Sequence, residues 1–408
     1  MKFLKKALRI LYVFPYTIGV AFLALFLWMR KGDCITLFGY YGMSDTSPRR
    51  NLGDNAILTA MLRCFSSIDT RKLIYVFDKV GKYSSFGEEY YINCEGKTNL
   101  IKWLPIISKT DVFVMGGGGL QQAYSSIGTT LFFLSLNLLF WVAGRKIMWY
   151  SVGIGPLSTR LSMIFTAIAA KMADTITVRD NLSKELLIRI GVNEKKIYTT
   201  ADPVFALGAS QLPRIKGKND KPITIGLSLI PFYKVSGLST QKDKKTVEVY
   251  RDFIQVLVSR RFSVSLMTFT NTEDKTIFDE ILKGTNWGGN LKIVGMGASV
   301  TEMLEQYTGL DYMVAMRFHS AVLGCVSGIP TGAVIYHPKV RALVREFELK
   351  KYSCELEDIS LVKLKEILDN LIADRDILIE KTQEFVRKKR ILIELNKKLL
   401  CELVKKKS

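Results

Sequence analysis

The chain has 408 residues, enough for two domains of ordinary size, and its 48% apolar and 24% charged residues are typical of a folded protein. The formal net charge of +20 raises nucleic acid as a partner, but much of the surplus lies in the last 28 residues, where ten Lys or Arg stand against three Glu. Because no aromatic interleaving, zinc-ligand spacing or helix-turn-helix pattern accompanies these charges, we expect no nucleic acid. An anionic membrane surface and a solvated basic helix both explain them.

The cysteines do not form a disulfide or metal framework, because no C-x-x-C pair occurs among positions 34, 64, 94, 325, 354 and 401. In a chain of this size they predict reduced thiols of a cytosolic protein and no metal site.

Residues 1–32 contain an apolar stretch, residues 8–29, that is long enough to cross a bilayer of about 30 Å. No small-residue cleavage site follows it, so it predicts a retained membrane-associated helix and not a signal peptide. Basic residues flank both ends, and Pro15 and Gly19 interrupt it, so its topology stays open between a span and a re-entrant or interfacial helix. A buried N-terminal helix is the alternative.

Residues 33–212 predict a first Rossmann-like domain, because short apolar runs alternate with helical stretches in the manner of βαβ units. The expected strands are residues 35–38, 73–77, 112–115, 146–152, 175–178 and 197–200. The apolar residues 130–143 are too short to span a bilayer and predict a buried helix, with a membrane contact as a further option.

Three polar or glycine-rich turns follow strands of this domain. Asn51 and Asp54 open a helix, where they serve either as caps or as contacts to an anion or sugar hydroxyls. A run of four glycines after a buried strand indicates close backbone approach to a ligand, although it is neither a P-loop nor a dinucleotide fingerprint. These glycines are Gly116, Gly117, Gly118 and Gly119.

Arg179 follows the strand 175–178 and is expected at the same sheet edge as the glycines. Asp180 with Ser183 predicts a helix cap. Asp202 fits a turn residue better than a ligand contact.

Residues 213–345 repeat the rhythm after a polar linker at 208–222, and they predict a second Rossmann-like domain. Its expected strands are residues 223–229, 264–269 and 291–294. A further strand ends at Met316, a helical segment then runs to residues 328–330, and another strand leads from there to a turn at residues 336–339. Residues 346–408 predict packing helices with a basic tail.

The chain's two histidines lie in this second domain, in two turns at the ends of neighbouring strands. The first turn carries Arg317 and His319, and the second carries His337 and Lys339. In an open parallel sheet this edge is where ligands bind, beside helix N-termini that attract anions. The cluster therefore favours an anion site over the alternative of a core histidine and a simple ion-pair arginine.

As a set, these motifs resemble the polysaccharide pyruvyl transferase family. The residues that carry the resemblance are 51–58, 116–119, 153–156, 178–180 with Ser183, 202–203, 316–319, and Tyr336 with Pro338 and Lys339. They span roughly residues 35–340. Phe318 stands where the family usually has Leu, and His337 where Asp is common; the second departure bears on the donor site.

The resemblance implies a two-domain fold of the GT-B type and no bound cofactor. It implies transfer of a pyruvyl group from phosphoenolpyruvate onto two sugar hydroxyls in a cell-surface or exopolysaccharide precursor, which forms a cyclic ketal. Cations would hold the donor's carboxylate and phosphate, with Arg317, Lys339 and Arg179 as candidates together with His337. His319 and Arg317 would be the catalytic residues, with His319 acting in proton transfer. Asn51, Asp54, Asp180 and the four glycines would hold the acceptor or an anionic group.

Two other functions fit the same motifs: a GT-B glycosyltransferase that uses a nucleotide sugar, and a non-catalytic membrane-attached subunit of a polysaccharide assembly system. A cytosolic donor favours a re-entrant or interfacial N-terminal helix at the cytoplasmic face of the inner or plasma membrane, with a glycan acceptor that is free or lipid-linked. The acceptor sugar and the oligomeric state are not encoded in these motifs.

Overall fold

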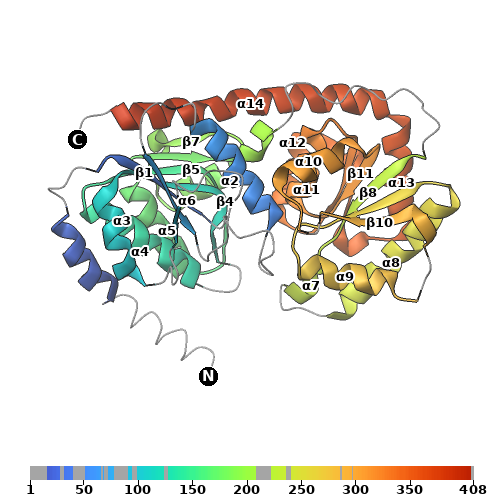
Figure 1. The fold of residues 1–408 in the computed structure, drawn as a ribbon, viewed down its shortest axis with the longest axis horizontal. Coiled ribbons are helices and arrows are strands. Elements are labelled where there is room, and N and C mark those ends of the chain that lie inside the picture. Colours follow the sequence, from blue (N-terminus) through green and yellow to red (C-terminus); the bar gives the residue numbers. More distant parts are fainter. Residues whose placement is uncertain are drawn as a thin grey trace. The chain divides into compact units, whose positions relative to one another are not determined.

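The computed structural model describes residues 16–27, 32–39, 51–65, 68, 72–77, 91–93, 99–123, 127–207, 222–235, 240–284, 287–295 and 297–405. Within these ranges the chain forms two α/β units, each built on its own parallel sheet (Figure 1). The first unit takes the residues up to 44, 60–203 and from 391 onward, and the second takes 45–59 and 204–390. The expected linker at 208–222 lies almost wholly outside the described residues.

The sheet of the first unit has the strand order β3-β2-β1-β4-β5-β6-β7, with every described pair parallel. Helices cover both faces of such a sheet, so its strands are apolar without alternation, as in the fully buried β1. The strand order reverses between β1 and β4, which makes the ends of these strands the switch point where ligands bind in open α/β sheets. The strands are β1 (Cys34–Phe38), β2 (Lys72–Phe77), β3 (Tyr91–Asn93), β4 (Thr110–Ala123), β5 (Lys146–Leu157), β6 (Thr175–Val178) and β7 (Ile197–Thr199).

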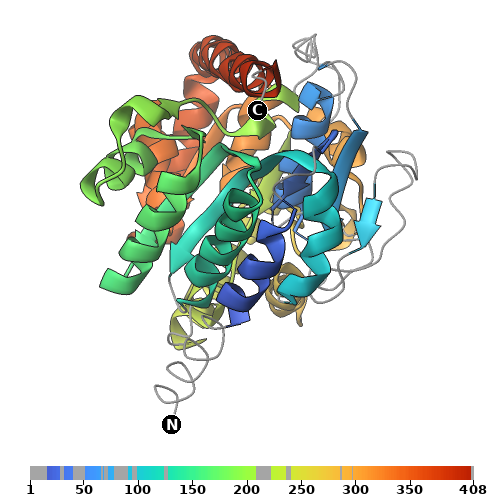
Figure 2. The same ribbon diagram turned by 90° about the vertical axis from the view of Figure 1, so that its left-hand side faces the viewer.

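One face of this sheet is covered by a layer of helices that includes the helical residues 16–25, called here the N-terminal helix (Figure 2). The core helix of the layer is α4 (Gly128–Val142). It is apolar on nearly all sides, as expected of a helix that packs both on β4 and against α5 (Arg160–Met172). A hydrogen bond between Ser135 of α4 and Thr17 connects it to the N-terminal helix. This confirms the buried helix predicted at 130–143. The layer also holds α3 (Leu104–Lys109) and α6 (Asn181–Arg189).

The apolar stretch at residues 8–29 is described only from Tyr16 to Leu27. No helix in the described ranges combines the length and the apolar character needed to cross a membrane.

The sheet of the second unit has the strand order β10-β9-β8-β11-β12-β13, again with parallel pairs. Its strand order reverses between β8 and β11, so the end of β11 is the switch point of this unit. The strands are β8 (Thr224–Ser228), β9 (Ser263–Met267), β10 (Leu291–Val294), β11 (Tyr312–Ala315), β12 (Thr331–Ile335) and β13 (Ser353–Glu355).

Most helices of the second unit connect these strands, and some begin at side-chain caps, such as the capping box of Ser299 and Glu302 at α10. They are α7 (Phe232–Val235), α8 (Thr240–Ser259), α9 (Glu273–Leu282), α10 (Val300–Thr308), α11 (Phe318–Val326), α12 (Pro338–Glu346) and α13 (Leu361–Ala373). Two helices contribute residues to both units: α2 (Leu52–Phe65) and α14 (Arg375–Lys405). Short 3-10 helices occupy Leu100–Trp103, Glu194–Lys196, Pro203–Leu207, Gly288–Asn290, Leu349–Tyr352 and Leu356–Asp358.

The predicted α/β fold with two parallel sheets is confirmed. The prediction missed the three-residue edge strands β3 and β13, whose apolar runs are too short to give a period. It also treated residues 336–339 as a turn. Instead, Pro338 opens α12, where its fixed φ and missing N–H suit the first helical position.

Candidate functional site

Two helix N-termini meet the carboxyl edge of the second sheet at neighbouring strands. β11 pairs with β12 in parallel, α11 begins at Phe318 just after β11, and α12 begins at Pro338 just after β12. Arg317 and His337 occupy the residue before each helix. The edge therefore concentrates the positive ends of two helix dipoles at the switch point, which suits an anionic ligand.

The Arg317 side chain is held by carboxylates of α9. Its guanidinium donates from Nε to Asp274 Oδ1 at 2.9 Å, with a second, short bond from Nη2 to the same oxygen. Nη2 also reaches Glu273 Oε2 at 3.2 Å and Thr270 Oγ1 at 3.0 Å. Asp274 is fully buried and accepts the backbone N–H of Phe269 and of Thr270. Arg317 is thus an ion-pair partner first, the alternative that the sequence left open.

Burial lowers the pKa of Arg317, but the adjacent Asp274 carboxylate outweighs it, so the pKa of the guanidinium stands above its ordinary value. The charge stays on Arg317, and Asp274 already neutralises it. A substrate anion would therefore bind this guanidinium more weakly than a cation that has no carboxylate partner.

His319 lies in the first turn of α11, half-buried, with its ring edge-on to Phe318 at a centroid distance of 5.1 Å. The N-terminus of α2 closes over it: a Cβ built on Gly53 would lie 2.0 Å from Nδ1 of His319. Asn51 fixes that turn, since its side chain accepts the Gly53 N–H at 3.0 Å and its backbone bridges Thr270. The two motifs around residues 51 and 319 therefore form one site within the second unit.

Replacing Gly53 by alanine should lower the turnover number by at least about tenfold, because the added methyl group forces the His319 ring out of place, and a shift of about 1 Å can cost a hundredfold in rate. The matched control is Gly289→Ala, where the new Cβ meets nothing within 4 Å. Steady-state kinetics of both variants would measure this loss of turnover. Equal rates for Gly53→Ala and the parent protein would show that the position of His319 is not critical.

Lys339 and His337 complete this edge with different roles. Lys339 Nζ lies 5.7 Å from the centre of the Phe318 ring, so its charge reaches the α11 terminus. His337 Nδ1 accepts the backbone N–H of Lys339 at 3.2 Å and caps α12. Among the described residues no carboxylate forms an ion pair with Lys339, so Lys339 is better placed than Arg317 to meet an anion.

The first unit has a polar edge of its own, formed by glycines of β4, by Gly153 of β5 and by Arg179, the residue after β6. The sequence predicted Gly116 to Gly119 in a turn, but they lie within β4, which continues to Ala123. Gly117 and Gly118 have φ values of 67° and 77°, a left-handed conformation that a side chain would strain. Gly116 is also constrained, since a Cβ there would lie 2.2 Å from Cε of Met61. The glycine run thus serves the path and packing of the chain at this edge, and its exposure of backbone to a ligand remains a prediction.

Arg179 lies flat on the backbone of Gly153, with three guanidinium atoms 2.8–2.9 Å from where a Cβ would stand. It donates from Nη1 to Asp202 at 3.0 Å, and Asp180 lies 3.5 Å from Nε. Asp180 also accepts the Ser183 N–H at 2.7 Å, which confirms it as the cap of α6. Asp202 is therefore a buried ion-pair partner, although its sequence suggested a turn.

A buried hydroxyl and amide network lies beneath this edge. Ser151 has a left-handed φ of 49°, unusual for a residue with a side chain, and its N–H donates to Thr177 Oγ1 at 2.7 Å. Asn396 of α14 donates to Ser151 Oγ at 2.9 Å and accepts from Thr177 Oγ1 at 2.5 Å. Thr200 Oγ1 lies 3.1 Å from Ser151 Oγ. The network fixes the strained residue just ahead of Gly153, where Arg179 rests.

A family model described as polysaccharide pyruvyl transferase matches residues 51–338, more than half of the chain. The chain belongs to the polysaccharide pyruvyl transferase family. The match begins at Asn51, beside His319, and ends at Pro338, the first residue of α12. It therefore includes the polar edge of the first unit and, in the second unit, Arg317, His319 and His337, and it ends one residue before Lys339.

This pyruvyl transferase family member is similar in fold to solved structures of nucleotide-sugar enzymes, so its two-sheet fold is GT-B-like. UDP-GlcNAc 2-epimerase from Neisseria meningitidis, bound to UDP-GlcNAc, aligns with a TM-score of 0.58 and 11% identity over 92% of this chain and 100% of that one. MnaA from S. aureus with UDP aligns with a TM-score of 0.58 and 11% identity over 87% and 91%. The UDP-GlcNAc 2-epimerase of Methanocaldococcus jannaschii gives 0.54 and 13% over 82% and 91%. No curated protein matches the sequence.

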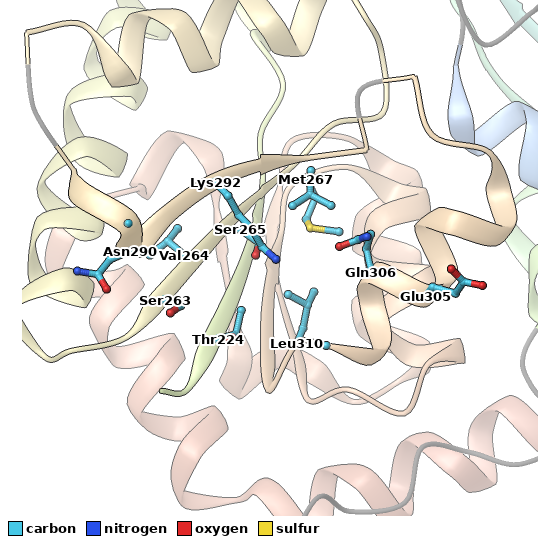
Figure 3. Close-up of a pocket in the computed structure, with 13 residues that line it drawn as sticks. Thr224, Ser263, Val264, Ser265, Met267, Asn290, Lys292, Glu305, Gln306 and Leu310 are labelled. Carbon is cyan, nitrogen blue, oxygen red and sulfur yellow. The ribbon is translucent and has the colours of Figure 1, made fainter. Parts of the chain in front are cut away.

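In this family member a cavity of about 260 Å³ opens on the second sheet (Figure 3), and the motif residues that follow β11 and β12 do not line it. Thr224 and Ser263, the first residues of β8 and β9, contribute to its lining, together with Lys292 of β10 and Gln306 of α10. Arg317 and His319 do not. The cavity is smaller than the usual volume of about 300–1,000 Å³ for a ligand pocket, so we place the candidate active site at the strand ends.

The predicted pyruvyl transferase residues thus divide between the units. The second unit brings together Asn51, Arg317, His319, His337 and Lys339, and Asp54 lies in the first turn of α2 beside them. The first unit holds Arg179, Asp180 and Gly116 to Gly119. The sequence interpretation missed Asp274 and Thr270. Asp274 could have been noticed, because an acidic residue in the first turn of a helix that follows a strand is a candidate site residue.

Proposed function

We propose that the chain transfers a pyruvyl group from phosphoenolpyruvate to two hydroxyls of a sugar in a cell-surface or exopolysaccharide precursor, which forms a cyclic ketal. The observation that supports it most is the second unit's switch point, where His319 and two helix N-termini lie within the family match and Lys339 directly follows its last residue. This set can neutralise a small dianion and move a proton, which is what the reaction requires.

The donor's phosphate and carboxylate would be held by Lys339 and the first backbone amides of α11 and α12. Arg317 would act mainly by positioning: its bonds to Asp274 fix the start of α11 and hence His319. The contact to Glu273 is the more exposed one, and a substrate carboxylate could replace it. His337, the cap of α12, would shape the donor site without contacting the reacting atoms.

The chemistry balances as two C–O bonds formed and one broken. The first sugar hydroxyl attacks the central carbon of the enol while the methylene carbon gains a proton and becomes a methyl group. The second hydroxyl then displaces inorganic phosphate and closes the ketal, and its proton leaves with the phosphate. His319 would deliver the methylene proton or accept the hydroxyl proton, a role that contributes about a hundred- to ten-thousand-fold in rate.

The polar edge of the first unit would serve the acceptor. Arg179, Asp180 and the glycine turn are rigidly held there, and rigid polar groups suit the recognition of sugar hydroxyls. Arg179 is already paired with Asp202, so hydrogen bonding would outweigh net charge in this role. The acceptor would be a glycan, with its lipid-linked form as the candidate at the cytoplasmic face of a bacterial membrane.

A nucleotide-sugar glycosyltransferase is the second candidate, because the similar folds include structures bound to UDP and UDP-GlcNAc. The two candidates differ in donor, so thermal unfolding with phosphoenolpyruvate and with a panel of nucleotide sugars separates them. A ligand at about a hundred times its dissociation constant stabilises by about 2.7 kcal/mol. We expect phosphoenolpyruvate to raise the unfolding temperature and UDP sugars to leave it unchanged.

The same measurement on Lys339→Gln should give no response to phosphoenolpyruvate, since the variant lacks the cation that would meet the donor. Lys292→Gln is the control, because Lys292 lines the separate cavity on the sheet. Stabilisation by a UDP sugar alone would replace the proposal with the second candidate. Loss of the response in Lys292→Gln but not in Lys339→Gln would move the donor site to the cavity.

A further inference from the structure

The N-terminal helix buries its small side chains and exposes its large apolar ones, the reverse of a helix on a water-facing surface. Its buried residues are the small ones, Thr17, Val20, Ala21 and Ala24. Its large side chains point outward, with Phe22 66% and Phe26 71% exposed, accompanied by Ile18, Leu23 and Leu25. Burial of large apolar side chains is the main favourable term in folding. A helix that exposes them to water therefore lacks that stabilisation.

α5 exposes apolar side chains in the same manner. Its inner face, which includes Phe165, Ala169 and Ala170, packs on the core. Its outer face carries Leu161, Met163, Ile164 and Ile168, all exposed. A helix on a water-facing surface carries polar residues on that side.

These faces lie in one layer of the first unit, the layer that Figure 2 turns toward the viewer. α4 lies between the N-terminal helix and α5: it bonds the former through Ser135 and packs along the latter. At the end of α4, Trp141 is 53% exposed. We call the outward residues of the N-terminal helix and α5, with Trp141, the outer helix face. Large apolar side chains exposed on neighbouring helices of one layer are typical of an interaction site.

The helices that carry the outer helix face contain basic residues but no acidic ones. The first acidic residue of the sequence is Asp33, and neither α4 nor α5 contains Asp or Glu. Arg160 and Lys171 stand at the two ends of α5, exposed. Residues 1–15, which precede the N-terminal helix in the sequence, add four Lys or Arg and a further apolar run. Phe, Leu and Trp flanked by Lys and Arg is the composition of surfaces that insert into an anionic lipid interface.

We propose that the outer helix face docks on an anionic lipid surface, with the N-terminal helix and α5 lying in the interface plane and Trp141 at headgroup level. A second copy of the chain is the competing occupant, but it would bring the same positive charges together, whereas anionic headgroups complement them. The docking is independent of which group the enzyme transfers. It would place the first unit beside a lipid-borne acceptor.

The test uses the full chain and flotation with vesicles of phosphatidylcholine alone or mixed two to one with phosphatidylglycerol. We expect binding to the mixed vesicles at least about tenfold stronger than to the neutral ones, because several basic residues contribute. Ile164→Glu with Ile168→Glu should weaken that binding by about tenfold or more. Val362→Glu is the control, since Val362 is 72% exposed on α13 of the other unit.

Activity on a soluble acceptor separates this proposal from the proposed function. The double variant should keep that activity but no longer bind the vesicles. Absence of wild-type binding, or equal binding by the double variant, would overturn the docking proposal. A dimer in sedimentation that the double variant converts to a monomer, without vesicle binding, would assign the face to a second copy of the chain instead. Circular dichroism melting of the variant confirms that it is folded.

Discussion

Replacing His319 by glutamine is expected to lower the turnover number with phosphoenolpyruvate by about a hundred- to ten-thousand-fold while the protein stays folded. Glutamine keeps polar groups of similar reach but has no group that titrates near neutral pH. The ring is fixed between Phe318 and the Gly53 turn, so its loss removes a positioned proton carrier rather than a mobile side chain. Steady-state kinetics with phosphate release as the readout would measure the change.

The matched control is the other histidine of the chain. His337 caps α12 through Nδ1, and asparagine is among the best capping residues, so His337→Asn should change both rate and stability little. A rate loss in His337→Asn as large as that in His319→Gln would give His337 a part in the chemistry. Full activity of His319→Gln would remove the proposed proton-transfer role.

Replacing Asp274 by alanine is expected to destabilise the second unit by about 3–5 kcal/mol, because it leaves the guanidinium of Arg317 buried without its main counter-charge. It also leaves the N–H groups of Phe269 and Thr270 without their acceptor. Urea unfolding followed by circular dichroism would measure the difference. Activity should fall as well, since the start of α11 loses its support.

Asp369→Ala provides the comparison, because it breaks an exposed pair with Arg260 and should change stability by about 1 kcal/mol or less. The double substitution Asp274→Leu with Arg317→Met removes both charges together and should recover most of the lost stability. Recovered stability without recovered activity would establish that the pair serves the site. A change below about 1 kcal/mol in Asp274→Ala would show that Arg317 has other sufficient partners.

The sequence predicted those parts of the fold that depend on local patterns. Most strands were recognisable as apolar runs followed by polar turns, and the histidines at the ends of β11 and β12 could be placed on one edge from topology alone. The edge strand β13 was missed because three residues give no period. The helix α12 was missed because Pro338 was interpreted as part of a turn.

The partners of the predicted residues could not be obtained in this way. Asp274 precedes Arg317 by 43 positions, and no local pattern connects them. The Gly53 turn lies over His319 only because the first residues of α2 join the second unit, a fact of tertiary packing. Asn396 reaches Ser151 across 245 positions. Such contacts are set by the fold as a whole, so a single sequence predicts the reactive groups better than the groups that hold them.

Neither unit of this protein is a continuous piece of its gene. The first unit takes residues from both ends of the chain, including Asn396, and the second takes the start of α2 from within the first. A fragment cut between residues 203 and 222 would therefore lack essential parts on either side. The two units cannot be exchanged with those of a relative by a single crossover, so the proposed acceptor and donor sites would be inherited together.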